Sequence, residues 1–435
     1  MKNIAIVPAC TDLNRGDQAL VWESVYFAED IFKGKTDVRI IDTGDTDEER
    51  FIQTNQTGKE GFKLARNILG HPRRGRKSKS TAAHDDLLNI FLMITTGVCD
   101  FVRLSLLICF PQLYKILLSN KEQVNSFLFL KSCDAYFVKG GGFLHTYGKF
   151  TDFYYIWYQT FYILLGWRLN VKVFILPNSF GPFQRNSLAT RYLSWILTTC
   201  KIVYAREKIS KNVLENELKL KNVHYGPDFG YFIKRKKSNI KIDSNKTKVA
   251  ITARPYRFPK SENPEDKYIE YIDAMAKFSD WLVREKNCEV YFITQVQGPS
   301  SHENDNIAIS DIRQRTKEDN MHIDIEGDYR ELADIYSQFD LVTGTRFHSV
   351  IFSQVFNVPA FAIAYGGNKS RGIMKELNLE KYVVDIEDAS DSLLMEMYEN
   401  ITIHRHEYIN ELKLSKKVFE EERLNMLNMV RGYFV

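Results

Sequence analysis

The run Ile4-Ala-Ile-Val-Pro8, the polar loop Thr11–Asp17 and the segment Gln18–Phe32 that follows them decide the fold. The run is apolar without alternation, which is typical of a strand buried on both faces. Gln18–Phe32 has apolar residues at helical spacing, and Val38–Asp42 is a second strand. This strand–helix–strand unit predicts a parallel sheet covered by helices on both sides.

The same pattern recurs along the rest of the chain. Seven further apolar runs each precede a polar or glycine-bearing loop, with helix-like segments between them, so we predict a doubly wound α/β fold. The runs are Ala135–Val138, Val171–Leu176, Ile202–Ala205, Lys248–Ala253, Glu289–Thr294, Leu341–Thr343 and Ala360–Ala364.

The length of 435 residues predicts more than one domain. The lysine-rich stretch between Tyr231 and Lys248 has the composition of an exposed connection, and we place the domain boundary there. We expect an N-terminal Rossmann-like domain over 1–235, with an insert at about 50–125, and a C-terminal Rossmann-like domain over 236–400. Residues 401–435 are expected to form a helix that packs back on the first domain.

Composition excludes several classes of protein. Hydrophobic residues make up 44% and charged residues 26%, so a largely disordered chain is excluded. The formal net charge of +4, from 59 basic and 55 acidic residues, is too small for a dedicated nucleic-acid-binding protein. The six cysteines stand singly, which favours a reducing cytoplasm. No uncharged run reaches the roughly 20 apolar residues of a membrane-spanning helix.

The insert leaves two interpretations open. Its first part, Lys63–Lys79, is basic without an acid, and Leu87–Leu118 is strongly apolar. The segment is either a flexible loop followed by buried helices, or a surface patch that rests on anionic lipid at the inner membrane face. The basic residues are Lys63, Arg66, Arg73, Arg74, Arg76, Lys77 and Lys79.

The stretch Leu341–Phe356 carries the clearest sign of chemistry. It predicts a strand, a Gly-Thr turn and a helix, with Arg346 and His348 at the junction, where backbone N–H groups and the helix dipole favour an anion. An arginine fork binds carboxylate or phosphate, and an imidazole moves protons near neutral pH. We therefore predict a catalytic site that handles an anion. The loop Tyr365–Gly372 follows the next strand and adds the charge of Lys369.

Loops in the first half favour a sugar as second ligand. Asn14 and Asp17 stand at the start of a helix, where an amide caps and a carboxylate accepts a proton. Gly140–Gly142 and Asn178–Phe183 follow strands and offer close backbone approach, hydroxyls and amides. No metal site is expected, because the histidines at 404 and 406 cannot share a helix face and residues 302–306 read as a solvated loop.

The ordered motifs resemble those of the polysaccharide pyruvyl transferase family. The resemblance covers most of the chain except Arg50 to about Asn125. The motifs are Asn14–Leu20, Lys139–Leu144, Leu176–Phe183, Ala205–Ser210, Gly226–Phe229, Gly344–Ser349 and Tyr365–Lys369.

The resemblance implies the architecture of the B-type glycosyltransferases (GT-B), an α/β fold with two Rossmann-like domains facing a cleft. It also implies transfer of a pyruvyl group from phosphoenolpyruvate to a sugar as a cyclic ketal, without a cofactor, for a bacterial capsule, exopolysaccharide or cell-wall polymer. By similarity His348 is the general acid and Asp17 a candidate base. The implied donor-binding residues are Arg206, Arg254, Arg346, Lys369 and Ser370. The implied acceptor-binding residues are Asn14, Asp17, Gly141, Gly142, Asn178 and Ser179.

Two alternatives remain: a glycosyltransferase that uses a nucleotide sugar on the same fold, and a non-catalytic component of a polysaccharide assembly complex. The acceptor also stays open. A galactose or N-acetylmannosamine unit, free or lipid-linked, would suit the family, and the expected location is the cytoplasm, with or without contact to the membrane.

Overall fold

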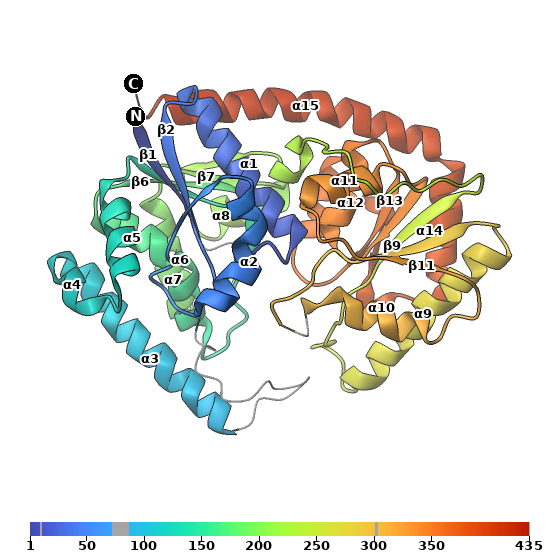
Figure 1. The fold of residues 1–435 in the computed structure, drawn as a ribbon, viewed down its shortest axis with the longest axis horizontal. Helices are drawn as coiled ribbons and strands as arrows, with labels where there is room; N and C mark the ends of the chain where they lie inside the picture. Colours follow the sequence, from blue (N-terminus) through green and yellow to red (C-terminus); the bar gives the residue numbers. More distant parts are fainter. Residues whose placement is uncertain (9–10, 72–86, 301–302, 435) are drawn as a thin grey trace. The chain divides into compact units, whose positions relative to one another are not determined.

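The computed structural model describes residues 1–8, 11–71, 87–300 and 303–434. Contacts between Cα atoms divide the chain into two compact units, each built around a parallel sheet (Figure 1). The first unit comprises Met1–Asp12, Leu20–Asp228 and Glu422–Val435. The second comprises Leu13–Ala19 and Phe229–Glu421. The chain therefore has the two-domain α/β architecture that its pattern of apolar runs predicts.

The strands of the first sheet lie in the order β3-β2-β1-β4-β6-β7-β8, with β5 beside β6, and all these pairs are parallel. The strands are β1 (Lys2–Val7), β2 (Thr36–Ile41), β3 (Lys63–Ala65), β4 (Ala135–Val138), β5 (Gly141–Leu144), β6 (Lys172–Phe180), β7 (Ile202–Ala205) and β8 (Val223–Tyr225). The helices of this unit are α1 (Arg15–Phe32), which begins in the second unit, α2 (Asp47–Lys59), α3 (Leu87–Cys109), α4 (Tyr114–Leu117), α5 (Lys121–Ser132), α6 (Asp152–Arg168), α7 (Leu188–Thr198) and α8 (Lys208–Asn216).

Both faces of the first sheet are buried, which explains why its strands are apolar without alternation. On one face, Val138 and Ile175 belong to the same core as Phe161 of α6. On the other face, the ring centroid of Phe137 lies 6.2 Å from that of Phe27 in α1. The end of the chain covers this second face as well, since Phe434 packs against Phe174 and Phe32.

The second sheet has the strand order β11-β10-β9-β12-β13-β14, and its pairs are also parallel. The order reverses between β9 and β12, and ligands of such sheets bind beyond the carboxyl ends of the strands at this switch point. The strands are β9 (Lys248–Thr252), β10 (Glu289–Ile293), β11 (Met321–Ile323), β12 (Leu341–Gly344), β13 (Ala360–Ala364) and β14 (Val383–Asp385). The helices are α9 (Pro264–Arg284), α10 (Asp305–Arg313), α11 (Tyr329–Tyr336), α12 (Phe347–Val355), α13 (Lys369–Glu376), α14 (Asp391–Ile403) and α15 (Arg405–Arg431), whose last turns belong to the first unit.

The segment Leu13–Ala19 joins the second unit through backbone and side-chain hydrogen bonds. Asn14 forms an isolated antiparallel bridge with Val296, and Gln297 donates its N–H to the carbonyl of Leu13 at 2.8 Å. The side-chain oxygen of Gln18 accepts from the N–H of Tyr329, also at 2.8 Å, at the first residue of α11. The first turn of α1 is thus fixed to the loop after β10.

Two local predictions were wrong. Strand β6 continues to Phe180, because Gly141–Leu144 pairs with its end as β5, so Asn178 and Ser179 lie in a strand and not in a loop. Helix α13 begins at Lys369, so the last residues of the predicted loop Tyr365–Gly372 lie in a helix.

Of the two interpretations left open for the insert, buried helices describe only one face of α3. The segment Asn89–Cys109 of this helix is long enough and apolar enough to cross a membrane, judged by length and composition only. Only 22% of its most apolar window is buried inside the protein. Asp100 interrupts the uncharged run of the sequence, but the helix continues through it, and Arg103 pairs with Asp100 one turn later, at 3.0 Å. Arg73, Arg74, Arg76, Lys77 and Lys79 lie outside the described residues.

Candidate functional site

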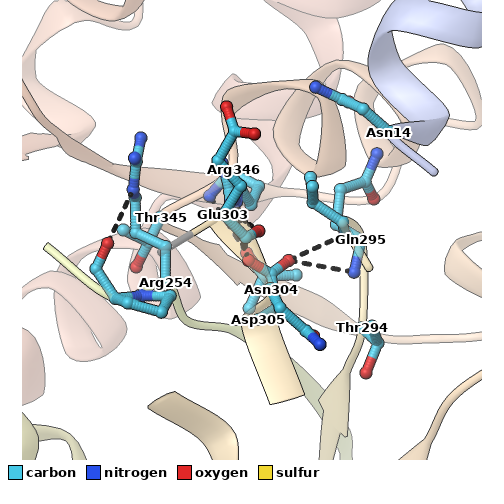
Figure 2. Close-up of polar contacts among 12 residues, drawn as sticks. Asn14, Arg254, Thr294, Gln295, Glu303, Asn304, Asp305, Thr345 and Arg346 are labelled. Atoms are coloured by element: carbon cyan, nitrogen blue, oxygen red, sulfur yellow. Dashed lines mark hydrogen bonds and ion pairs between the residues drawn. The ribbon is translucent and has the colours of Figure 1, made fainter. Parts of the chain in front are cut away.

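Charged and polar side chains gather at the carboxyl edge of the second sheet. Arg254, Gln295, Arg346 and Tyr365 come directly after or within two residues of the ends of β9, β10, β12 and β13, which are neighbours in the sheet. Arg254 and Arg346 follow the two strands that flank the switch point. Figure 2 shows Arg254, Gln295 and Arg346 of this group.

Arg346 is held by a buried ion pair. Its Nε donates to Asp305 at 2.7 Å, and its Nη2 donates to the carbonyl of Glu303 at 2.6 Å. Arg346 is 8% exposed and Asp305 is fully buried. Nη1 makes no hydrogen bond to any other described residue, so one arm of the guanidinium keeps its donors for a ligand while the rest of the group is fixed.

Asp305, which holds Arg346, is itself fixed by backbone hydrogen bonds. Its carboxylate accepts from the backbone N–H groups of Gln295 and Val296, at 3.1 and 2.9 Å. Burial raises the pKa of Asp305, and the positive charge of Arg346 limits that rise. The interpretation of residues 302–306 as a solvated loop was therefore wrong for Asp305, which begins α10 inside the unit.

Tyr365 lies among three cations. The guanidinium carbon of Arg254 is 3.9 Å from the centroid of its ring. Burial alone would raise the pKa of Tyr365, but the positive charges of Arg254, Arg346 and Lys369 outweigh burial and lower the pKa to about 7. The structure thus brings together three of the predicted donor-binding residues. The sequence did not identify Tyr365 as a site residue, because a single tyrosine after a strand is not by itself typical of any function.

His348 lies in the first turn of α12, against the first turn of α1. A Cβ built on Gly16 would collide with the imidazole of His348, so only glycine allows this approach. Asn14 caps α1, accepting from the N–H groups of Gly16 and Asp17 at 3.1 and 3.2 Å. The capping role predicted for Asn14 is confirmed. Asp17 occupies the same turn, which places the candidate base on the turn that touches the candidate acid.

Lys369 and Ser370 open α13 after β13. Lys369 Nζ lies 5.7 Å from the ring centroid of Phe347, the residue that precedes His348. Ser370 is 8% exposed. The cation of Lys369 therefore stands beside the start of α12, where the backbone dipoles also favour an anion.

Arg206 belongs to the first unit, whereas the residues described above belong to the second. It is 1% exposed, and its Nη1 donates to Asp228 at 2.5 Å while its Nε donates to Ser179 at 2.8 Å. Glu207, beside it, accepts from Ser179 at 2.9 Å, and burial raises the pKa of this glutamate. These contacts give Arg206 a structural task at the carboxyl ends of β6 and β7.

The glycines of β5 in the first unit pack against the same arginine and against Asn178. A Cβ on Gly142 would lie 3.3 Å from Nη2 of Arg206, and one on Gly141 would lie 3.5 Å from the side-chain oxygen of Asn178. Asn178 is fully buried and donates to the carbonyls of Lys139 and Leu176, at 2.9 Å each. Neither that oxygen nor Nη2 of Arg206 has a hydrogen-bond partner among the described residues.

Within the described ranges, no group of three or more His, Cys, Asp or Glu side chains is arranged to hold a metal ion. The side chains that the structure brings together at this edge are cations, a histidine and a tyrosine. Such a set binds a small anion and supplies a proton to it.

Replacing Tyr365 with Phe should remove a single tyrosine ionisation near pH 7. The wild-type chain should show tyrosinate absorbance rising through that pH, because the three cations stabilise the phenolate. Since the pKa is lower in the folded chain than the ordinary value of 10, the free energy of unfolding of the wild type should increase relative to Tyr365→Phe as the pH rises from about 7 to 10. Identical spectra for the two proteins across pH 6 to 8 would contradict the described geometry.

Comparison with known structures identifies the architecture. *Staphylococcus aureus* MnaA in complex with UDP matches with a TM-score of 0.56 at 10% identity, over all of this chain and 97% of that one. *Arabidopsis thaliana* UGT89C1 complexed with UDP matches with a TM-score of 0.55 at 11% identity, over 99% of each chain. At such identities the likeness shows the GT-B type of fold and nothing of the ligand.

Comparison of sequences points to one family. The amylovoran biosynthesis protein AmsJ of *Erwinia amylovora* is 26% identical over 286 residues, which are 61% of this chain and 65% of that protein. The chain thus spans just under two thirds of this relative's length. The model of the family described as polysaccharide pyruvyl transferase matches residues 14–367, from the cap of α1 to the loop after β13. The chain belongs to the polysaccharide pyruvyl transferase family.

Proposed function

We propose that the protein transfers the pyruvyl group of phosphoenolpyruvate to two hydroxyls of a sugar as a cyclic ketal, during synthesis of a bacterial surface polysaccharide. The observation that carries the proposal is the convergence of Arg254, Arg346 and Lys369 on Tyr365 at the switch point of the second sheet. Phosphoenolpyruvate is small and carries a phosphate and a carboxylate, and several fixed cations are what such a donor requires. AmsJ, a relative named for biosynthesis of a polysaccharide, supports the setting.

Ketal formation needs one proton at the vinyl carbon of the donor. In the proposed reaction His348 gives this proton, the methylene becomes a methyl group, and the neighbouring carbon takes up positive charge. A first sugar hydroxyl adds there and loses its proton to a base, for which Asp17 is the candidate. The carbon–oxygen bond to phosphate then breaks, and the second hydroxyl closes the ring and loses its proton to the departing phosphate. Phosphate leaves with the electrons of the broken bond.

The cations act on the charged parts of this pathway. Nη1 of Arg346 is directed by its buried pair with Asp305, and Arg254 and Lys369 add charge from neighbouring strands. They bind the donor and stabilise the phosphate as it departs. A bound phosphate also repels the phenolate of Tyr365, so donor binding should raise the pKa of this residue above about 7.

The residues proposed to bind the acceptor come from both units. Asn14 and Asp17 stand beside His348, where a sugar hydroxyl would have to be activated. Gly141, Gly142, Asn178 and Ser179 belong to the first unit, and the hydrogen bonds of Asn178 and Ser179 there suggest that they position β5 and the end of β6 for a sugar. Arg206 has the same supporting task. We place the reaction in the cytoplasm, where phosphoenolpyruvate is made.

Incubation of the protein with phosphoenolpyruvate and a panel of free and lipid-linked glycosides tests the function. Mass spectrometry should show one glycoside whose mass increases by that of pyruvic acid less one water, with release of phosphate. Activity should persist with a chelator present. Calorimetry with UDP is the matched arm: binding of UDP without binding of phosphoenolpyruvate would overturn the proposal in favour of a nucleotide-sugar transferase.

A further inference from the structure

Helix α3 exposes a continuous row of large apolar side chains. They recur every three or four residues, which places them on one face of the helix. We call this row the apolar stripe; it consists of Phe91, Ile94, Val98, Val102, Leu106 and Phe110. Each of the six is between 42% and 63% exposed, and the row continues beyond the helix to Ile116, at 80%.

The apolar stripe is on the side where a surface helix normally carries polar residues. A large contiguous apolar surface on a soluble chain marks a site that another molecule covers. The mean hydropathy of the most apolar window of this helix is 1.8, which is in the range of membrane-spanning helices. Length and composition therefore fit either a helix that spans a membrane or one that lies on it.

The opposite face of α3 decides between these two. Leu104 and Leu107 are fully buried in the core of the first unit, and the ring of Phe101 lies 4.7 Å from that of Trp157 in α6. Asp100, 3% exposed, forms its ion pair with Arg103 on the same helix. A helix packed against protein along one side, with charges in its middle, cannot be surrounded by lipid. It offers one face only, as interfacial helices do.

Charge identifies the partner. Residues 72–118 contain seven basic and three acidic residues, a net charge of +4 that equals the net charge of the whole chain. In the described part of this stretch, 87–118, the one acid is the buried Asp100, whereas Lys115 is exposed. The apolar stripe thus belongs to a stretch of chain that is positive and whose described part exposes no carboxylate.

We propose that the apolar stripe rests on the surface of an anionic phospholipid bilayer. Apolar side chains enter the acyl boundary while exposed cations such as Lys115 meet the negative headgroups, and the two contributions add. A second copy of this chain is a poorer partner, because a symmetric dimer would set the same positive stretch against itself. Trp167 also favours lipid as the partner, because exposed tryptophans are typical of membrane surfaces and its side chain is 45% exposed. It stands next to α3 in the structure, since the following residue, Arg168, donates to the carbonyl of Cys109 at the end of α3. The inference does not depend on the proposed reaction.

Vesicle flotation of the full chain tests the proposal. The wild type should float with vesicles of phosphatidylcholine and phosphatidylglycerol, less with phosphatidylcholine alone, and less again at high salt. The double variant Val98→Asp/Val102→Asp should reduce the bound fraction at least about tenfold, since two carboxylates enter the interface. The matched control is Leu414→Asp/Val418→Asp, which has the same spacing and 60% and 51% exposure on α15, and it should float like the wild type.

A second measurement does not depend on how the aspartate variant folds. Cys99 is exposed on α3, whereas Cys133, Cys200 and Cys288 are buried. A polarity-sensitive dye on Cys99, in a chain with the cysteines at 10 and 109 changed to serine, should shift its emission to the blue with anionic vesicles and not without them. No flotation of the wild type, or no dye response, would overturn the proposal. A dimer that Val98→Asp/Val102→Asp separates, without vesicle binding, would assign the apolar stripe to a second copy.

Discussion

His348→Gln should lower the rate of pyruvyl transfer by about 10²- to 10⁴-fold, which is the usual contribution of a positioned general acid. Glutamine keeps a polar side chain of similar reach but cannot give a proton to the vinyl carbon of the donor. The loss should appear in kcat under saturating phosphoenolpyruvate, while calorimetry should give a donor dissociation constant close to that of the wild type. This split separates a failure of proton transfer from a failure of binding.

Two further variants control the result. His406→Gln changes an exposed histidine on α15 and should leave the rate unchanged. Gly16→Ala removes no ionisable group, but its Cβ would displace the imidazole of His348, so it should slow the reaction as well. Near-normal turnover of His348→Gln would show that another group delivers the proton, and it would leave the donor-binding cations untouched as a hypothesis.

Arg346→Lys should weaken binding of phosphoenolpyruvate by about 10- to 100-fold, the effect of losing a charge-assisted hydrogen bond. The guanidinium spans Asp305 and the carbonyl of Glu303 while Nη1 remains for the donor. An ammonium is a point charge and cannot serve both sides, and the buried Asp305 would compete for it. Calorimetric titration with phosphoenolpyruvate measures the change directly.

The buried pair also contributes to stability, and this must be measured beside affinity. Removing one partner of such a pair costs about 3 to 5 kcal/mol, so the melting temperature of each variant is needed. Arg315→Lys is the matched control, because Arg315 forms a surface pair with Asp273 at 2.8 Å and should affect neither quantity. Unchanged donor affinity in a folded Arg346→Lys protein would exclude Arg346 from the donor site.

The sheets could be predicted from sequence because their strands obey a simple rule. Strands covered on both faces are uninterrupted apolar runs, and β4, β7 and β13 begin and end where the runs do. The shorter strands β3, β8 and β11 escaped prediction, since three residues at a sheet edge contain no pattern. For α3 the sequence left a buried and an exposed interpretation open, because the helix is apolar on both sides and periodicity cannot say which side a protein covers.

At the site, the sequence identified candidate functional residues but not the residues that contact them. Arg346 and His348 stand out because a strand-to-helix junction is a recognisable place for an anion. Asp305, 41 positions away, could not be linked to Arg346 without the fold. The low pKa of Tyr365 depends on three cations that follow three different strands, and no one of these segments contains that information.

The membership of Leu13–Ala19 in the second unit has a consequence for how the protein can be divided. Gln18 and Tyr329 are 311 positions apart, so this segment leaves the ribosome long before the residues that hold it have been made. A fragment that starts at Phe229 would lack it altogether. Expressing the second unit by itself therefore requires a permuted gene or a synthetic peptide that returns residues 13–19, and a chain truncated before α11 leaves Gln18 without its partner Tyr329.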